Sequence, residues 1–328
     1  MVWIEFILCL LLIFFSGRKV ASYGDIIAER TGLGGAWIGL VLLALVTSLP
    51  ELFTGVSAIT LAKSPDLTIG DLFGANSFNL LNLALLDIAS RNGSLLAVVT
   101  STHRLTVRFS LALVFTAAAA IFLSNYFPTP GIAWIGWSTP VIVGLYLFSI
   151  RYIFVRERGK ATPQIADRYS AELDLKVIYR NFALASVVII GAGIWLAILG
   201  KEIATVTGWE ESFVGSLLIA FTTTLPEITV SFTALRLGAI NLAFANMIGS
   251  NLFNMTIIPI DDLIYNQGPV LAAVSSSHLV IALTVMAMTG ILIAGLRYRP
   301  KRFFRLSWYN CATIVVFLLG TYFHFNLG

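Results

Sequence analysis

Long runs of apolar residues, separated by short polar segments, are the main pattern along the chain. About 20 apolar residues are needed to cross the hydrocarbon core of a bilayer as a helix. The pattern predicts ten spans, at residues 2–16, 35–62, 68–90, 106–124, 132–150, 181–200, 209–236, 240–262, 271–295 and 306–325. Strands of a membrane β-barrel would be about ten residues long and would alternate apolar with polar residues. The longer, uniformly apolar runs instead predict an all-α polytopic membrane protein.

An internal repeat divides these spans into two sets of five. Two motifs recur in order and at matching spacing: Thr47, Leu49, Pro50, Glu51, Gly74, Asn76 and Asn79 correspond to Thr223, Leu225, Pro226, Glu227, Gly249, Asn251 and Asn254. Because five is odd, the second set would start from the opposite side of the membrane, as in transporters built from inverted repeats. We therefore expect a first repeat at 1–150, a cytoplasmic linker at 151–180 and a second repeat at 181–328.

Composition supports a membrane protein. Hydrophobic residues make up 58% of the 328 residues and charged residues 12%, whereas soluble domains carry about 25% charged residues. Of the 21 basic residues, all except Lys63 and Lys201 fall in loops on one predicted side. Positive loops stay in the cytoplasm, so both termini are expected outside the cell membrane. This distribution accounts for the net charge of +4 without a nucleic-acid partner, and the first span shows no cleavable-signal pattern.

Two carboxylates, Glu51 and Glu227, lie within predicted spans, each directly after a proline. A charge at bilayer depth costs about 2.5–3.5 kcal/mol even on a lenient insertion scale, and no basic residue sits inside these spans to pair with either one. Proline has no N–H, so the helix breaks and frees a backbone carbonyl. Such backbone is tolerated at this depth only when it is buried or lines a cavity.

The residues beside the two prolines supply further oxygen ligands. Thr47 and Ser48 precede Pro50, and Thr223 and Thr224 precede Pro226. Two carboxylates would neutralise a divalent ion, and hydroxyl and carbonyl oxygens can complete the six to eight ligands that Ca²⁺ prefers. Since these motifs contain no Cys or His, soft metals fit less well.

The second repeated motif offers amide groups, from Asn79 in one copy and Asn254 in the other. Asparagines of this kind either join helices by hydrogen bonds or give amide oxygens to a hard cation. Their pairing with the Pro-Glu motifs favours a place in or beside a cation site.

The remaining polar residues are expected in structural or peripheral roles. Asp87 and Asp262, at span ends, are interpreted as solvated helix-end charges. His103 and His278 are interpreted as helix caps or interfacial hydrogen-bonding groups. The sequence places Asp66, Asp71 and Asp261 among loop or entrance charges.

With these motifs the chain resembles the Ca²⁺/cation antiporter superfamily, in its prokaryotic sodium/calcium exchanger-like branch. The two Thr-x-x-Pro-Glu and two Gly-x-Asn-x-x-Asn segments carry the resemblance and correspond to the two α-repeats of that family. The resemblance implies ten helices, alternating access and a four-subsite cation cluster at the midplane.

The resemblance also implies roles for single residues. Glu51 and Glu227 would be the central Ca²⁺ carboxylates, with Asn79 and Asn254 between them. Backbone carbonyls would come from Thr47, Thr223, Ala44 and Ala220, and hydroxyls from Ser48, Thr224 and Ser250. Ala75 stands where the family usually has serine, which removes a hydroxyl and leaves Na⁺ coupling open.

The predicted function is exchange of Ca²⁺ for Na⁺ or H⁺ by a monomer with no cofactor, in contact only with inorganic cations and lipid. The nearest alternative is an antiporter of the same fold for another divalent cation, such as Mg²⁺ or Mn²⁺. A channel fits less well because the site is completed within one chain. An intramembrane enzyme fits least, since the apolar spans contain no recognisable catalytic motif.

Overall fold

Our computed structural model describes residues 2–30, 43–90, 93–99, 101–127, 131–157, 174–236, 238–299 and 303–327. The first half contains α1 (Val2–Arg30), α3 (Ala44–Thr47), α4 (Leu49–Ser57), the π-helix η2 (Ala58–Ala62), α5 (Pro65–Ala89), α6 (Leu95–Val98), α7 (Ser101–Tyr126), the strands β1 (Gly131–Ile132) and β2 (Ile135–Gly136), and α8 (Ser138–Glu157). The second half contains α9 (Leu175–Thr207), α10 (Glu211–Val214), the π-helix η3 (Gly215–Ile219), α11 (Ala220–Thr223), α12 (Leu225–Arg236), α13 (Ile240–Ile264), the 3₁₀ turn η4 (Val270–Ala272), α14 (His278–Tyr298) and α15 (Trp308–Leu327).

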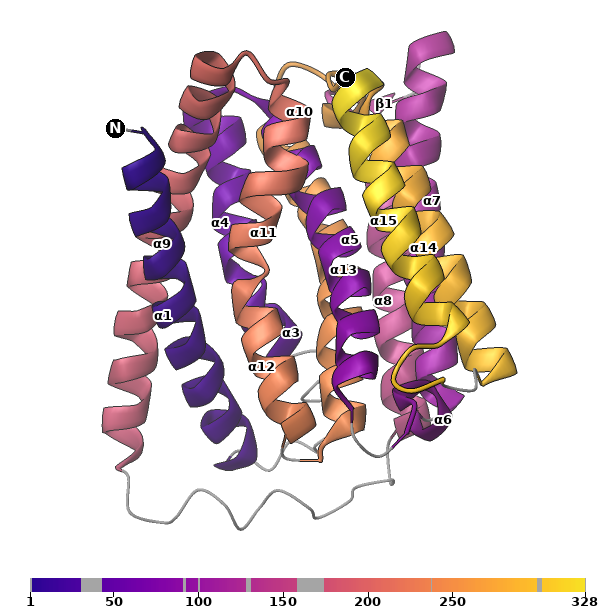
Figure 1. Cartoon of the computed structure of the whole chain (residues 1–328). Coiled ribbons are helices and arrows are strands. Elements are labelled where there is room, and N and C mark those ends of the chain that lie inside the picture. Colours follow the sequence, from indigo (N-terminus) through magenta and orange to yellow (C-terminus); the bar gives the residue numbers. More distant parts are fainter. Residues whose placement is uncertain are drawn as a thin grey trace.

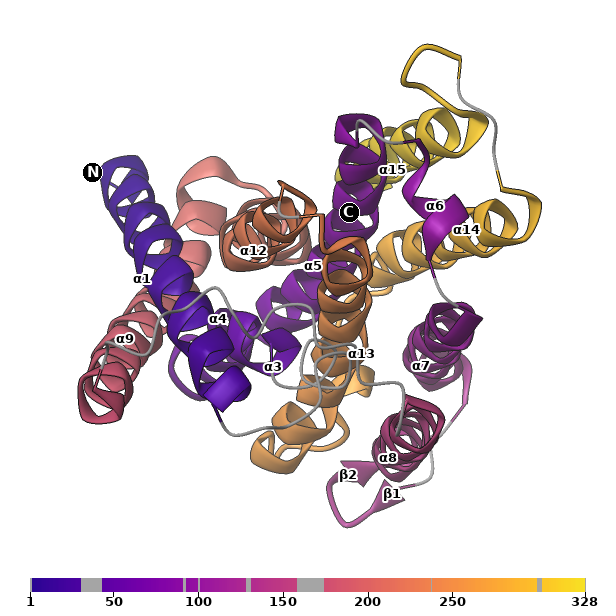
Figure 2. The same ribbon diagram turned by 90° about the horizontal axis from the view of Figure 1, so that it is seen from below.

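The helices form one bundle in which the start of α1 and the end of α15 lie at the same end (Figure 1). Helices α5 and α13 cross at its centre, and α1 packs against α9 on one flank (Figure 2). Of the most apolar window of α5, 78% is buried, compared with 28% in α8 and α15. Helix α5 is therefore enclosed by protein, while the outer helices face the lipid.

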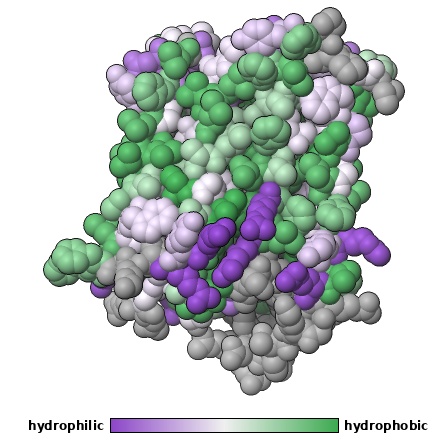
Figure 3. Space-filling model, turned by 90° about the vertical axis from the view of Figure 1, so that its right-hand side faces the viewer, coloured by the Kyte–Doolittle hydropathy of each residue, from purple (hydrophilic) through white to green (hydrophobic). Residues whose placement is uncertain are grey.

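The outer surface fits a bilayer. A broad hydrophobic band covers the face shown in Figure 3, with hydrophilic residues gathered towards the ends. Among the described residues, six helices are long and apolar enough to span a membrane, or seven when Glu211–Thr223 and Leu225–Arg236 count as one bent span. The chain is thus a multi-pass membrane protein, and the full number of ten spans stays a prediction.

Several predicted boundaries shift. Helix α1 continues through the polar segment to Arg30, well beyond the first apolar run. The predicted starts at 132 and 271 are not α-helical, since residue 132 lies in β1, which pairs antiparallel with β2, and residue 271 lies in the 3₁₀ turn η4 before α14. Prolines and glycines such as Gly131, Gly136 and Pro269 favour turns there. Helices α8 and α9 reach into the predicted 151–180 linker, and residues 31–42 and 158–173 lie outside the described part.

Candidate cation-binding site

Each Pro-Glu motif sits at a break within a helical path. Helix α3 ends at Thr47, Ser48 forms a turn, and α4 begins at Leu49 with Pro50 in its first turn. In the second half, α11 ends at Thr223 and α12 begins at Leu225, with a bend of 43° between the two segments. Because proline lacks the N–H that would continue the ladder, both breaks fall where the motifs predict them.

Close backbone packing places α5 against the second break. A Cβ on Gly74 would overlap the carbonyl oxygen of Ser216 in η3 and would lie 2.7 Å from the Cβ of Ala220. Gly70 likewise meets Gly215, with 3.1 Å between a Cβ on Gly70 and the Cα of Gly215. Such contacts, possible only for residues without a side chain, bring helix backbones close together in membranes.

Gly74→Ala should therefore destabilise the protein. The added methyl group meets backbone, which has little freedom to move, so we expect a loss of about 1–3 kcal/mol. Thermal unfolding of the purified protein in detergent measures the change. Gly144→Ala on α8 is the matched control, because a Cβ added there would have no side chain or other helix within 4 Å among the described residues. Equal melting temperatures for the two variants would contradict the packing described here.

Glu51 and Glu227 both lie inside the bundle with no exposed surface. They are close enough to interact electrostatically, and within the described residues neither forms an ion pair with a basic side chain. Ser48 Oγ donates to Glu227 Oε1 at 2.9 Å, and Ser250 Oγ donates to the same oxygen at 3.3 Å. The two halves thus meet at this pair of carboxylates.

The other predicted hydroxyls are arranged unequally. Thr47 Oγ1 lies 3.4 Å from Ser250 Oγ and donates to Asn246 Oδ1, whereas Thr223 Oγ1 donates to Asp71 Oδ1 at 2.9 Å. Thr224 turns back to its own helix, where its Oγ1 donates to the carbonyl of Ala220 at 2.8 Å. Its hydroxyl is therefore not shared with a carboxylate.

The carbonyls of Ala44 and Ala220 both carry hydrogen bonds. Ala44 O accepts the Ser48 N–H at 3.0 Å and Thr47 Oγ1 at 3.2 Å. Ala220 O accepts the Thr224 N–H at 3.1 Å. Both residues are buried, at the start of the short helix that precedes each break, and their role as cation ligands stays a prediction.

The asparagines of α5 and α13 bind one another reciprocally. Asn76 Nδ2 donates to the carbonyl of Asn251 at 3.4 Å, and Asn251 Nδ2 donates to the carbonyl of Asn76 at 3.3 Å. Asn79 Nδ2 donates to Asn251 Oδ1 at 2.9 Å, and Asn254 Nδ2 donates to Asn76 Oδ1 at 3.2 Å. Asn76 and Asn251 join the helices, while Asn79 and Asn254 keep their amide oxygens free for another partner.

Five buried acceptor oxygens of these side chains have no hydrogen-bond partner in the described part of the chain: both of Glu51, Oε2 of Glu227, and Oδ1 of Asn79 and Asn254. Buried polar groups are almost always bonded, so such a group points to a missing ion or water. In the described residues no three His, Cys, Asp or Glu side chains form a metal-binding group. A cation here would be held by two carboxylates with amide, hydroxyl and carbonyl oxygens, the ligand set of a hard ion.

Asp71 and Asp261 are not loop or entrance charges, and the sequence interpretation was wrong for both. Each is fully buried, on α5 and α13 respectively. Asp71 interacts electrostatically with Glu51 and Glu227. One signal for Asp71 was available, since its repeat counterpart Asn246 is also polar and also accepts a threonine hydroxyl.

Asp87 and Asp262 do lie near helix ends, but they are buried rather than solvated. Asp87 accepts the N–H of Leu95 at 2.6 Å, and Asp262 accepts that of Val270 at 2.7 Å. Both carboxylates therefore bind the backbone of the segment that follows their helix.

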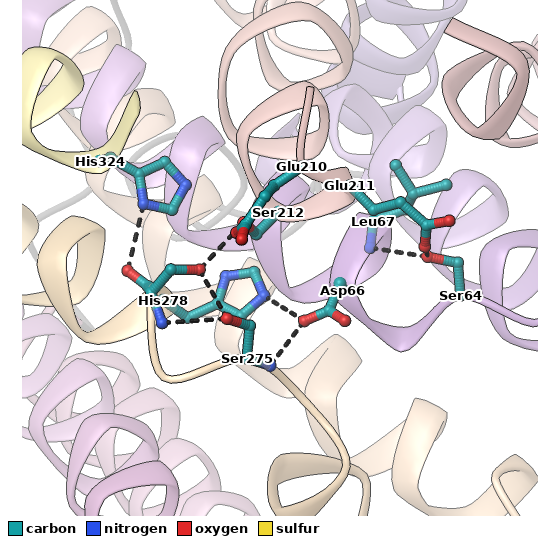
Figure 4. Close-up of polar contacts among 10 residues, drawn as sticks. Ser64, Asp66, Leu67, Glu210, Glu211, Ser212, Ser275, His278 and His324 are labelled. Carbon is teal, nitrogen blue, oxygen red and sulfur yellow. Dashed lines mark hydrogen bonds and ion pairs between the residues drawn. The ribbon is translucent and has the colours of Figure 1, made fainter. Parts of the chain in front are cut away.

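His278 has the structural hydrogen-bonding role expected of it. Its Nε2 lies 2.9 Å from Asp66 Oδ1, which also accepts the Ser275 N–H (Figure 4). His324 Nδ1 contacts the carbonyl of Ser277 at 3.1 Å. This cluster joins α5, α14 and α15 near one end of the bundle. His103, the repeat counterpart of His278, packs on the ring of Phe244 with centroids 5.1 Å apart.

Comparisons with known proteins identify a family for this chain. The chain matches the family described as "Sodium/calcium exchanger protein" over residues 1–155 and 180–326. It is 23% identical to "Putative antiporter CaxA" of Alkalimonas amylolytica, over 97% of this chain and 96% of that one. It is 24% identical to "Inner membrane protein YrbG" of Escherichia coli K12, over 76% and 75% of the two chains.

A solved structure has the same fold. The sodium-calcium exchanger NCX_Mj, soaked with Na⁺ and Sr²⁺, superposes with a TM-score of 0.62 at 20% sequence identity, covering 97% of this chain and 98% of that one. At this identity the likeness concerns the fold alone.

Proposed function

Because the chain belongs to the sodium/calcium exchanger protein family, we propose that it exchanges Ca²⁺ for Na⁺ or H⁺ at a site between Glu51 and Glu227. The observation that carries the proposal is the set of five unpartnered, buried oxygens of Glu51, Glu227, Asn79 and Asn254. Two negative charges in a water-poor site need a compensating charge, and Ca²⁺ supplies two positive charges.

The proposed architecture is a monomer of ten spans in two inverted repeats, with the site near the membrane midplane. The reciprocal bonds between Asn76 and Asn251 support such a relation, since an inverted pair would exchange the same contacts in both directions. The basic loops support a cell-membrane orientation with both termini outside.

In the proposed mechanism the site opens to alternate sides by rocking of α1 and α9 against the other helices. These two helices pack together and each touches a helix that carries a carboxylate. A Cβ on Gly17 of α1 would lie 2.9 Å from the Cβ of Pro226, and one on Gly193 of α9 would lie 3.2 Å from Thr54 Oγ1. A change in the position of α1 or α9 would therefore reach the residues beside Glu227 and Glu51.

Exchange follows from charge compensation. Without a cation the site would leave two buried negative charges, which opposes reorientation, whereas a site neutralised by Ca²⁺, Na⁺ or protons can turn to the other side. Ions would then cross only against one another. The proposal includes both Na⁺ and H⁺ as coupling ions, because Ala75 lacks the hydroxyl that would favour a Na⁺ subsite.

The proposal predicts ⁴⁵Ca²⁺ uptake by proteoliposomes only when an outward gradient of a counter-ion is imposed. Uptake is measured with an outward Na⁺ gradient and, separately, with an outward H⁺ gradient, and the faster condition identifies the driver. Protein-free liposomes are the control, and competition by Mg²⁺ and Mn²⁺ tests the alternative cargo. Uptake that neither gradient accelerates and that does not saturate with Ca²⁺ would indicate a channel and refute exchange.

A further inference from the structure

A second pair of carboxylates lies beside the candidate cation-binding site, towards the end of the bundle where α5 begins and α13 ends. Asp71 and Asp261 are both fully buried. Asp71 Oδ1 accepts a hydrogen bond from Thr223, and Asp261 Oδ2 accepts one from Thr68 at 2.8 Å. Thr68 and Asp71 are three residues apart on α5, so they share one face of that helix.

One oxygen of each carboxylate remains without a hydrogen-bond partner in the described residues, Oδ2 of Asp71 and Oδ1 of Asp261. The two side chains interact electrostatically with each other, and within the described ranges neither forms an ion pair with a basic group. Two like charges at this depth repel, and their burial is costly unless a cation compensates them.

Helix α4 packs closely against the hydrogen-bonded pair of Thr68 and Asp261. Gly55 of α4 follows Glu51 by one helical turn and faces the Thr68–Asp261 pair. A Cβ at Gly55 would lie 2.7 Å from Thr68 Oγ1 and 3.2 Å from Asp261 Oδ2. Only glycine therefore lets α4 approach this pair so closely, and a side chain at position 55 would displace the Thr68 hydroxyl or the Asp261 carboxylate.

The second half of the chain has no such group at the corresponding positions. The repeat counterparts of Gly55, Thr68, Asp71 and Asp261 are Ser231, Ala243, Asn246 and Leu86. There, Asn246 Nδ2 donates to Ser231 Oγ at 3.0 Å and Ser231 Oγ donates to the carbonyl of Ala243 at 3.3 Å. Since a neutral, internally bonded arrangement serves the same helix crossing, the fold itself does not require the acidic pair.

We propose that Asp71 and Asp261, together with the Thr68 hydroxyl, bind a second divalent cation such as Ca²⁺. This second site lies between the Glu51–Glu227 site and the end of the bundle where the chain termini lie. The opposite end has no matching acidic pair at the repeat counterparts of these residues. Two carboxylates match the charge of the ion, and the hydroxyls of Thr68 and Thr223 lie beside them, which gives the all-oxygen set of a hard cation. The ion held there loads the Glu51–Glu227 site from one side of the membrane. The choice of Ca²⁺ rests on the proposed function, whereas the presence of a second site does not.

Equilibrium dialysis of the purified full-length protein against ⁴⁵Ca²⁺ counts the bound ions. We expect Asp71→Asn/Asp261→Asn to lose one of the ions bound by the wild type, and Glu51→Gln/Glu227→Gln to lose another. The variant with all four changes should bind none. Glu202→Gln, which removes an exposed carboxylate on α9, is the charge control and should keep the wild-type number.

Gly55→Ala tests the second site without removing a charge, because the added methyl group would press on Thr68 Oγ1 and Asp261 Oδ2. It should lose the same single ion, and a single peak on size-exclusion chromatography confirms that each variant is folded. An unchanged ion number in Asp71→Asn/Asp261→Asn would overturn the second site. Loss of every ion in that variant would also overturn it, because the two pairs would then form one site. An unchanged number in Glu51→Gln/Glu227→Gln would instead count against the proposed function alone.

Discussion

Glu51→Gln and Glu227→Gln should each abolish Ca²⁺ exchange. Each change removes one of the two charges that would balance Ca²⁺ and replaces a carboxylate oxygen with an N–H donor that points at the cation. Loss of one partner from a buried charge pair costs about 2–5 kcal/mol, which lowers Ca²⁺ affinity roughly 30-fold or more, since 1.4 kcal/mol is tenfold. Initial rates of ⁴⁵Ca²⁺ uptake by proteoliposomes, under the gradient that drives the wild type, measure the effect.

The structure also predicts a difference between the two variants. Glu227 already receives hydrogen bonds from Ser48 and Ser250, whereas both oxygens of Glu51 are unpartnered in the described part of the chain. The change Glu227→Gln would therefore disturb local bonding as well as ion binding, and it should lower the melting temperature more than Glu51→Gln does. Glu202→Gln is again the control with unchanged uptake. Wild-type rates in either site variant would remove the basis of the proposed function.

The burial of the two carboxylates in the candidate cation-binding site was largely predictable because these residues occur twice. Glu51 and Glu227 each follow a proline within an apolar run, and this arrangement has few stable outcomes other than a broken, inward-facing helix. The same repetition placed the asparagines near the carboxylates, but it did not show which hydrogen bonds each asparagine forms. Only the structure separates Asn76 and Asn251, which join the helices, from Asn79 and Asn254, whose amide oxygens have no partner among the described residues.

The residues that were missed are those that break the repeat. Asp261 has Leu86 at its counterpart position, so repetition gave it no weight, whereas the polar counterpart of Asp71, Asn246, was a signal left unused. The position of both aspartates near predicted span ends suggested exposure. Burial of a carboxylate depends on which helix covers it, and a one-dimensional pattern does not contain that information. The direction of the Thr224 hydroxyl was not predictable either, because a hydroxyl in a helix can donate to the carbonyl four residues earlier, as Thr224 does with Ala220.

Helix geometry was predictable only in outline. The π-helices η2 and η3 and the contact of Gly70 with Gly215 depend on the packing of two segments far apart in the chain. The starts of α8 and α14 were placed too early, since apolar residues in β1, β2 and η4 extend the hydrophobic runs beyond the helices. Apolar character thus predicts membrane burial better than it predicts where a helix begins.

Asp87→Ala and Asp262→Ala should each destabilise the protein strongly while leaving the cation ligands in place. Asp87 Oδ1 accepts hydrogen bonds from Ser94 Oγ and the Leu95 N–H, and its Oδ2 accepts one from Asn310 at 3.0 Å. Asp262 accepts bonds from Thr139 Oγ1 and from the N–H groups of Gly136 and Val270. Alanine would leave several buried donors without acceptors, at about 1–3 kcal/mol for each.

We expect each alanine variant to lose about 3 kcal/mol of stability or more, seen as a lower melting temperature in detergent. Asp87→Asn and Asp262→Asn should recover part of this loss, because one amide oxygen still accepts a hydrogen bond. Because neither side chain belongs to the candidate cation-binding site, Ca²⁺ affinity of the folded fraction should stay near the wild-type value. Lost Ca²⁺ binding at an unchanged melting temperature would instead make Asp87 and Asp262 ion ligands, and the division between loop-holding and ion-binding carboxylates would be wrong.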